Sequence, residues 1–68
     1  MVATVYDIQG EEEVNQAREI VTRCNGKVLT VVSSSSETVM KADFNGHRER
    51  EAEADIELCD AGFDVEWD

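Results

Sequence analysis

The sequence repeats one pattern of residues in its two halves, and this repeat limits the folds that the chain can adopt. The first half reads TVYDIQG, a charged stretch and CNGKVLTVV; the second reads TVMKADFNG, a charged stretch and CDAGFDVEW. The matched pairs are Thr4 with Thr38, Gln9 with Asn45, Cys24 with Cys59 and Gly26 with Gly62, at offsets of 34, 36, 35 and 36 residues. Nearly constant offsets predict two structural units of one type.

Each half is predicted to form a strand, a helix and a second strand. Alternating or continuous apolar residues rich in β-formers indicate the strands, and apolar residues three or four apart indicate the first helix. The predicted strands cover residues 2–8, 27–32, 37–44 and 63–67, and the predicted helices lie in 11–25 and 47–62. A polar connector, SSSS at 33–36, joins the halves.

The second helix has a conflicting pattern. In HREREAEADIELCDAG the acids fall at every second position, a spacing typical of strands. Ala, Glu, Arg and Leu are nevertheless strong helix formers, and β-branched residues are almost absent. We therefore expect a helix whose apolar stripe consists of Ala52, Ile56 and Cys59, with Leu58 beside it.

The order strand–helix–strand, taken twice, resembles the ferredoxin-like fold in its topology. This resemblance implies one α+β domain over 1–68, built from βαβ halves at about 1–33 and 37–68. It also implies a four-stranded antiparallel sheet in the order 4-1-3-2, with both helices on one face and the other face open. Phe63, Val65 and Trp67 should point toward the helices. The acids and the lysine expected on the open face are Asp7, Glu37, Lys41, Asp43, Asp64, Glu66 and Asp68.

The charge narrows the range of partners. Sixteen acids and six bases give a net charge of −10 and a pI near 4.3. Residues 1–36 carry a net −2 and residues 37–68 a net −8. Direct binding of DNA, RNA or anionic membrane is disfavoured, because it requires Lys and Arg, whereas a cationic protein partner is favoured. No apolar run approaches ~20 residues and no signal peptide is evident, so we expect a cytoplasmic protein, in the host cytoplasm if viral.

The residues give little indication of catalysis, and we expect a non-enzyme with no cofactor and no metal. There is no CxxC motif, and His47 is the only histidine. Cys24 and Cys59 are expected to be buried or half-buried thiols. RNA-recognition domains of this topology stack bases on open-face aromatics, and we expect this face to be acidic and to lack aromatics at its central positions.

Three interpretations remain. In the first, the chain inhibits a basic nucleic-acid-binding protein by presenting a surface similar in charge to nucleic acid. In size and charge it then resembles phage-encoded inhibitors such as anti-CRISPR and anti-restriction proteins. The partner-binding residues would be Asp43, Glu49, Glu53, Glu57, Asp64, Glu66 and Asp68.

The second interpretation is an oligomerising or ligand-sensing domain of ACT-like type. The apolar strand KVLTVV would then be an edge strand that pairs with a second copy to form a homodimer. The possible dimer edge consists of Val28, Leu29, Val31 and Val32. The third interpretation is adaptation to high salt, which explains the acidity without a partner.

Overall fold

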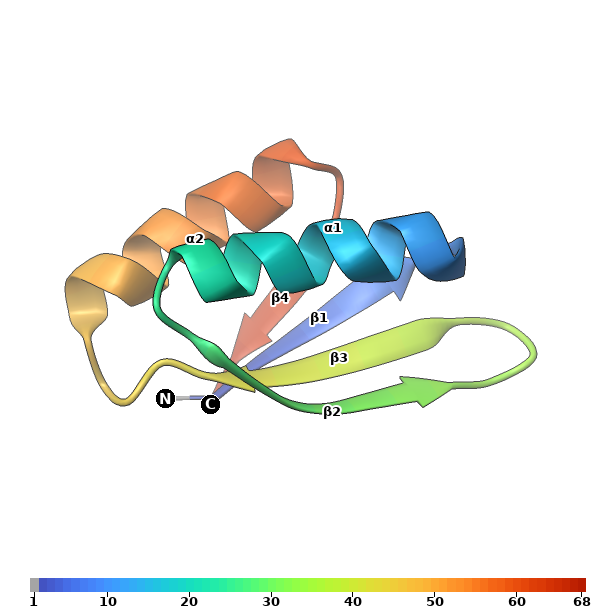
Figure 1. Cartoon of the computed structure of the whole chain (residues 1–68), viewed down its shortest axis with the longest axis horizontal. Helices are drawn as coiled ribbons and strands as arrows, with labels where there is room; N and C mark the ends of the chain where they lie inside the picture. Colours follow the sequence, from blue (N-terminus) through green and yellow to red (C-terminus); the bar gives the residue numbers. More distant parts are fainter. Residues whose placement is uncertain (1) are drawn as a thin grey trace.

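The computed structural model describes residues 2–68, so Met1, the first residue of the predicted domain, lies outside the described part. Its elements are β1 (Val2–Ile8), α1 (Gly10–Arg23), β2 (Lys27–Ser33), β3 (Thr38–Asp43), α2 (Arg48–Asp60) and β4 (Asp64–Trp67). The strands form an antiparallel sheet in the order β2-β3-β1-β4, and both helices lie on one face of it (Figure 1). The predicted α+β ferredoxin-like arrangement is confirmed.

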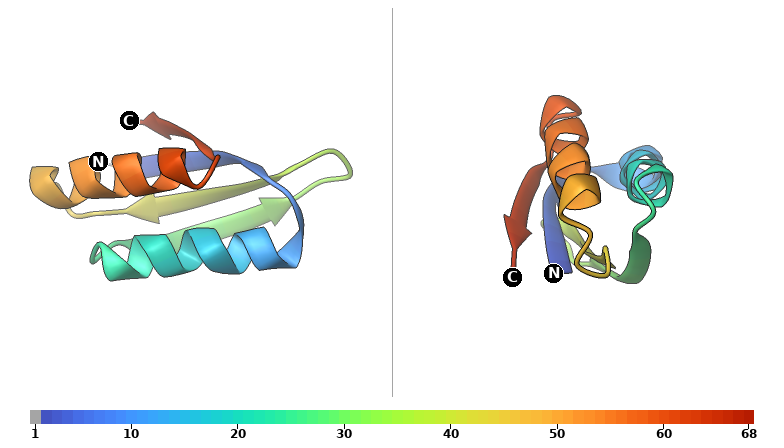
Figure 2. Two further views of the ribbon diagram at one scale, coloured as in Figure 1. Left: turned by 90° about the horizontal axis from the view of Figure 1, so that it is seen from above. Right: turned by 90° about the vertical axis from the view of Figure 1, so that its left-hand side faces the viewer.

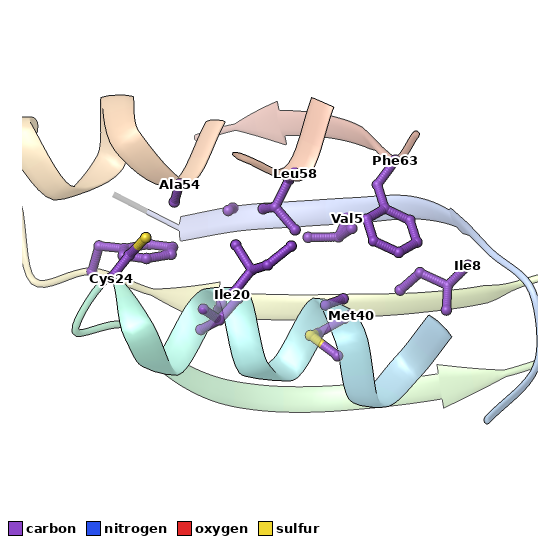
Figure 3. Packing of buried hydrophobic residues seen from close by; sticks show 13 residues of the cluster. Val5, Ile8, Ile20, Cys24, Met40, Ala54, Leu58 and Phe63 are labelled. Carbon is purple, nitrogen blue, oxygen red and sulfur yellow. The ribbon is translucent and has the colours of Figure 1, made fainter. Parts of the chain in front are cut away.

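The core lies between the two helices and the inner face of the sheet (Figure 3). Alternation along the strands places every second side chain on this face. The buried apolar residues are Ala3, Val5, Ile8, Ala17, Ile20, Val21, Cys24, Met40, Ala42, Phe44, Ala54, Leu58 and Phe63. Val65 and Trp67 are partly buried and pack against this cluster, so the predicted inward direction of the apolar residues around β4 is confirmed.

A bulge near the end of β1 changes the face on which Ile8 lies. The register with β3 shifts between Val5 and Ile8, and Asp7 adopts a positive φ of 62°. Simple alternation along 2–8 predicts that Ile8 lies on the same face as Thr4 and Tyr6. The structure differs, because the extra residue of the bulge returns Ile8 to the core, where it is buried.

The two helices end in the same backbone motif. After α1 the N–H of Gly26 donates to the carbonyl of Val21; after α2 the N–H of Phe63 donates to the carbonyl of Leu58. The left-handed residue between them is Asn25 in the first case and Gly62 in the second. The structural counterpart of Gly62 is therefore Asn25, and the match of Gly26 with Gly62 was one residue out of register.

The cysteines also differ between the halves. Cys24 is fully buried at the end of α1, whereas Cys59 is exposed on α2. The prediction that both are buried or half-buried was right for Cys24 and wrong for Cys59. The reason is that α2 turns a different face to the sheet from the predicted one.

The buried face of α2 consists of Glu51, Ala54 and Leu58. Ala52 and Cys59 are exposed, and Ile56 is 62% exposed, so the predicted stripe was wrong. With apolar residues at every second position, both sides of the helix offer a short apolar stripe, and spacing alone does not choose between them. Leu58 is selected by the C-terminal motif, whose bond from Phe63 turns the chain back under this face and into β4.

Gly26 permits a close approach between the end of α1 and β3. A Cβ placed on Gly26 would lie 2.5 Å from Cε1 of Phe44, a fully buried ring. The Gly26 backbone does not have a positive φ. Glycine is therefore needed at this position for space, and not for backbone freedom.

We expect Gly26→Ala to lower the free energy of unfolding by about 1–3 kcal/mol, because the new methyl group overpacks a rigid ring. Urea denaturation measures this change. In a Phe44→Leu background the same substitution should cost less, since the smaller side chain leaves room for it. An equal cost in both backgrounds would show that the ring is not the obstacle.

Candidate functional site

The seven acids predicted to bind a partner lie in two groups on opposite sides of the sheet. Glu49, Glu53 and Glu57 lie on α2, in the helical layer. The other four, Asp43, Asp64, Glu66 and Asp68, are at the open face. The strand register places Asp43 beside Val2, Asp64 beside Tyr6 and Glu66 beside Thr4, all out of phase with the buried Ala3 and Val5. One flat partner surface therefore does not contact both groups.

Of the three predicted acids on α2, Glu53 and Glu57 lie on the side of the helix that is near the end of α1. Glu57 forms an ion pair with Arg23, with 2.6 Å between Nη2 and Oε1, and it accepts a hydrogen bond from the Cys24 thiol at 3.3 Å. Glu53 pairs with Arg50 at 3.4 Å, and Glu49 is exposed. Glu57 thus contributes to the contact between the helices, while Glu49 and Glu53 face solvent.

Cys24 is held as a neutral thiol. Burial is the largest cause that raises its pKa, to about 11, and the hydrogen bond to Glu57 adds to the effect. A thiol with a raised pKa is a weak nucleophile at neutral pH. Its position favours a structural role.

Within residues 2–68, three donor atoms in the same region lie close enough together to hold a metal ion. One ligand atom each from Cys24, Glu53 and Glu57 lies within 4.8 Å of the others. A thiolate with two carboxylates suits Zn²⁺. Binding would require the Cys24 thiol to lose its proton and Glu57 to release Arg23, and both changes oppose metal binding here.

Two acids of β4, together with Asp68 directly after it, form a row on the open face, called the β4 row. Asp64, Glu66 and Asp68 are all exposed. Asp64 and Glu66 stand opposite Tyr6 and Thr4 on β1, and the N–H of Asp68 extends the pairing by donating to the carbonyl of Val2. All three β1 residues opposite the row are uncharged.

Tyr6 brings an aromatic ring to the open face on the central strand β1. Its hydroxyl donates to Oε2 of Glu66 at 3.1 Å. This hydrogen bond is the largest cause that raises the Tyr6 pKa, followed by burial and by the charges of Glu66, Glu37 and Asp68. The prediction that central positions lack aromatics was therefore wrong, although the ring is surrounded by acids and not by the bases that hold a phosphate backbone.

The side where α2 meets β4 contains contacts that the sequence did not predict. The indole N–H of Trp67 donates to Oδ1 of Asp55 at 3.1 Å, and the Trp67 ring lies 5.5 Å from that of Phe44. A shallow hollow of about 300 Å³ opens beside them, lined by Arg48, Glu51, Ala52, Asp55 and Trp67. A partly buried Trp usually finds an acceptor for its N–H, and this rule was the available signal for the contact with Asp55.

The net charge differs between the two sides of the sheet. Residues 48–68, which form α2 and β4, carry nine acids and two bases, whereas residues 20–36 carry no acid and two bases. β4 and β2 are the two borders of the sheet and lie on opposite sides of the molecule (Figure 2). One side is therefore strongly acidic and the other is free of acids.

The predicted dimer edge does lie at a border of the sheet. β2 has β3 as its only neighbour within the described sheet. Val28 and Val31 are half-buried against the core, while Leu29 is 46% and Val32 62% exposed. A register shift with β3 between Val28 and Thr30 leaves Leu29 as the additional residue of a bulge.

No protein-family model matches this chain, and no curated protein or solved structure shows significant similarity to it. Within residues 2–68, neither helix has the length and apolar character needed to cross a membrane.

We expect the free energy of unfolding to decrease as the pH rises from about 9 to about 11. The Cys24 pKa is about 11 in the folded chain against an ordinary value of 9.0. Below pH 9 the thiol is protonated in both states, and its contribution is complete. Between the two pKa values the unfolded thiol loses its proton first, which favours unfolding. Urea denaturation at a series of pH values measures the slope.

The Cys24→Ala variant is the control for this pH dependence. Tyr6 and Cys59, whose pKa values are also raised above their ordinary values, are the same in both proteins. The difference in slope between the two proteins therefore isolates the Cys24 thiol. Parallel slopes would contradict the expected role of Cys24, whatever the stability of the variant at neutral pH.

Proposed function

We propose that this chain is a non-enzymatic protein that binds a cationic, nucleic-acid-binding protein and blocks its nucleic-acid surface. The observation that carries the proposal is the row of acids on β4. Asp64, Glu66 and Asp68 are exposed on one face and stand opposite uncharged residues of β1. Such a row attracts a complementary positive surface at long range.

Uncompensated charge at this row is unusual for a solvated sheet. Opposite charges on neighbouring strands stabilise a sheet, and a surface without a partner usually mixes both signs. Lys41, the nearest lysine in this register, lies on β3 opposite Thr4, and Thr4 separates it from Glu66. Acids two residues apart on a strand are roughly 7 Å from each other, so the row presents a line of regularly spaced negative charges.

The acids of α2 support the proposal less directly. Two of the three predicted residues already have cationic partners, because Glu57 pairs with Arg23 and Glu53 with Arg50. Both pairs lie within the chain and reduce the negative potential along the helix. We therefore assign the main contact to β4 and a secondary, long-range contribution to Glu49 and Glu53.

The non-enzymatic character is also part of the proposal. Nucleophilic catalysis requires a Ser, Thr or Cys activated by a nearby base. The Cys24 thiol has a raised pKa and donates to Glu57. His47 is exposed, at the residue that precedes α2. The environment of Cys24 favours a structural role, and the exposed side chain of His47 makes no capping hydrogen bond at the start of α2.

The resemblance in size and charge to phage-encoded inhibitors suggests the kind of partner. Anti-CRISPR and anti-restriction proteins act on nucleic-acid-binding complexes in the host cytoplasm, and we propose the same location and class of target. The test is affinity capture with the tagged chain from a lysate of its native cells. Captured protein that is basic, and that excess duplex DNA or RNA releases, would support the proposal; captured protein that nucleic acid does not release would contradict it.

We expect the triple variant Asp64→Asn, Glu66→Gln, Asp68→Asn to bind the captured partner at least about tenfold more slowly, because long-range attraction governs the association rate. Surface plasmon resonance at several salt concentrations measures this rate. The salt dependence of the rate should also become shallower. The fold should persist, since Gln at position 66 still accepts from Tyr6.

The matched control changes three exposed acids of α1, as Glu11→Gln, Glu12→Gln and Glu19→Gln. Both variants raise the net charge by the same amount, so they differ in position alone. Glu13 is left unchanged because it accepts a hydrogen bond from the backbone N–H of Gln9 at the start of α1. Equal loss of binding in the two variants would show that overall charge matters, and not the β4 row.

A change in stability with salt separates this proposal from adaptation to high salt. The repulsion among ten net negative charges should be largely screened near 0.1 M, where the Debye length is about 10 Å. We therefore expect the melting temperature to rise up to about this ionic strength and then to level off. Circular dichroism at increasing NaCl measures it. A chain that stays unfolded until molar salt would support the high-salt interpretation.

A further inference from the structure

The two borders of the sheet are protected to different degrees. An exposed edge strand offers unpaired N–H and C=O groups to another chain, and proteins guard such edges with short strands, charges and bulges. β4 has four residues and carries the acidic row. β2 has seven residues, and its one charge, Lys27, and its bulge at Leu29 both lie in its first half. The open border is therefore the second half of β2, from Thr30 to Ser33.

Apolar groups are exposed along the same border. Leu29 is 46% exposed and Val32 is 62% exposed. α1 contacts β1, β2 and β3, so it spans the inner face of the sheet and does not fill the outer side of β2. The β2–β3 hairpin extends beyond the start of α1 (Figure 1). The outer side of β2 thus offers both hydrogen-bonding groups and apolar side chains.

The charge of this border permits a second copy of the chain to bind. A second copy of a chain with net charge −10 is repelled by most of its own surface. Residues 20–36, which include all of β2, contain no acid. A copy that approaches by this border meets Lys27, hydroxyl groups and apolar side chains. We propose that two copies pair antiparallel through β2 and form a homodimer with a continuous eight-stranded sheet.

The pairing has a defined geometry. A two-fold axis perpendicular to the sheet keeps the helices of both copies on one face. Because side chains alternate, residues opposite each other across such an axis must point to the same face. Thr30 to Ser33 keep a regular register with β3, beyond the bulge at Leu29. The axis therefore passes through one residue of this regular part of β2.

The dimer also limits electrostatic repulsion between the copies. Seven strand spacings separate the two β4 strands, or roughly 34 Å. This distance exceeds the Debye length of about 10 Å at 0.1 M several-fold. The acidic sides thus lie at the two ends of the assembly, and the dimer should tighten with added salt. The proposal does not depend on the function of the β4 row.

The test is sedimentation equilibrium of the whole chain between about 1 μM and about 1 mM, the range of weak to moderate protein association. Val32→Lys places a charge at the border and should raise the dissociation constant at least about tenfold. Ile56→Lys is the matched control, because Ile56 is also 62% exposed but lies on α2. It should leave the dimer intact. A monomeric wild type, or an equal effect of both substitutions, would overturn the proposal.

Disulfide trapping tests the geometry. Thr30→Cys, Val31→Cys, Val32→Cys and Ser33→Cys are made singly in a Cys59→Ser background, which removes the exposed native thiol. A residue on the axis stands opposite its own copy, with Cβ atoms about 4.5–5.5 Å apart. One variant should form a covalent dimer rapidly on oxidation, while Ile56→Cys should not. Cross-linking at Ile56 and not at β2 would place the interface elsewhere.

Discussion

The ring of Phe44 fixes how the helices and β4 meet, and the acidic surface depends on that arrangement. Phe44 is the largest fully buried side chain. Gly26 leaves space for it at the end of α1, and Trp67 packs against it with ring centroids 5.5 Å apart. Trp67 in turn donates to Asp55 on α2. With Trp67 held inward, alternation along β4 directs Glu66 and Asp68 outward.

The small hydrophobic core must stabilise the fold against strong electrostatic repulsion among the acids. A domain of this size buries only ~60% of the surface that its unfolded chain exposes, and the chain carries ten net negative charges. The acids lie on the rim and the two outer faces, and ion pairs such as that of Glu57 with Arg23 relieve some of the repulsion. Within residues 2–68, the acids of the β4 row form no such ion pair and remain exposed.

Strong local patterns and turn signals predicted the element order and the inward face of β4, whereas the sheet order followed from the resemblance to the ferredoxin-like fold. The sequence did not predict which side of α2 is buried. Apolar residues at every second position gave two equivalent stripes, and the packing of Ala54 and Leu58 into the core formed with the sheet decided between them. The sequence also did not predict the bulge at Asp7, because a bulge shifts the register of the strand and leaves no signal in the residue composition. The ion pair of Glu57 with Arg23 joins residues 34 positions apart and has no local signal.

The acidic border at β4 and the acid-free border at β2 have complementary effects on how copies of the chain associate. Acids on β4 deter another strand from pairing there, and the same acids remain available to a cationic surface. An equally acidic β2 would prevent all association of the copies, whereas an equally apolar β4 would permit open-ended chains of sheets. One guarded border and one open border allow pairing to stop at two copies. The uneven distribution of charge favours a cationic partner at β4. It also keeps β2 free of the acids that would repel a second copy.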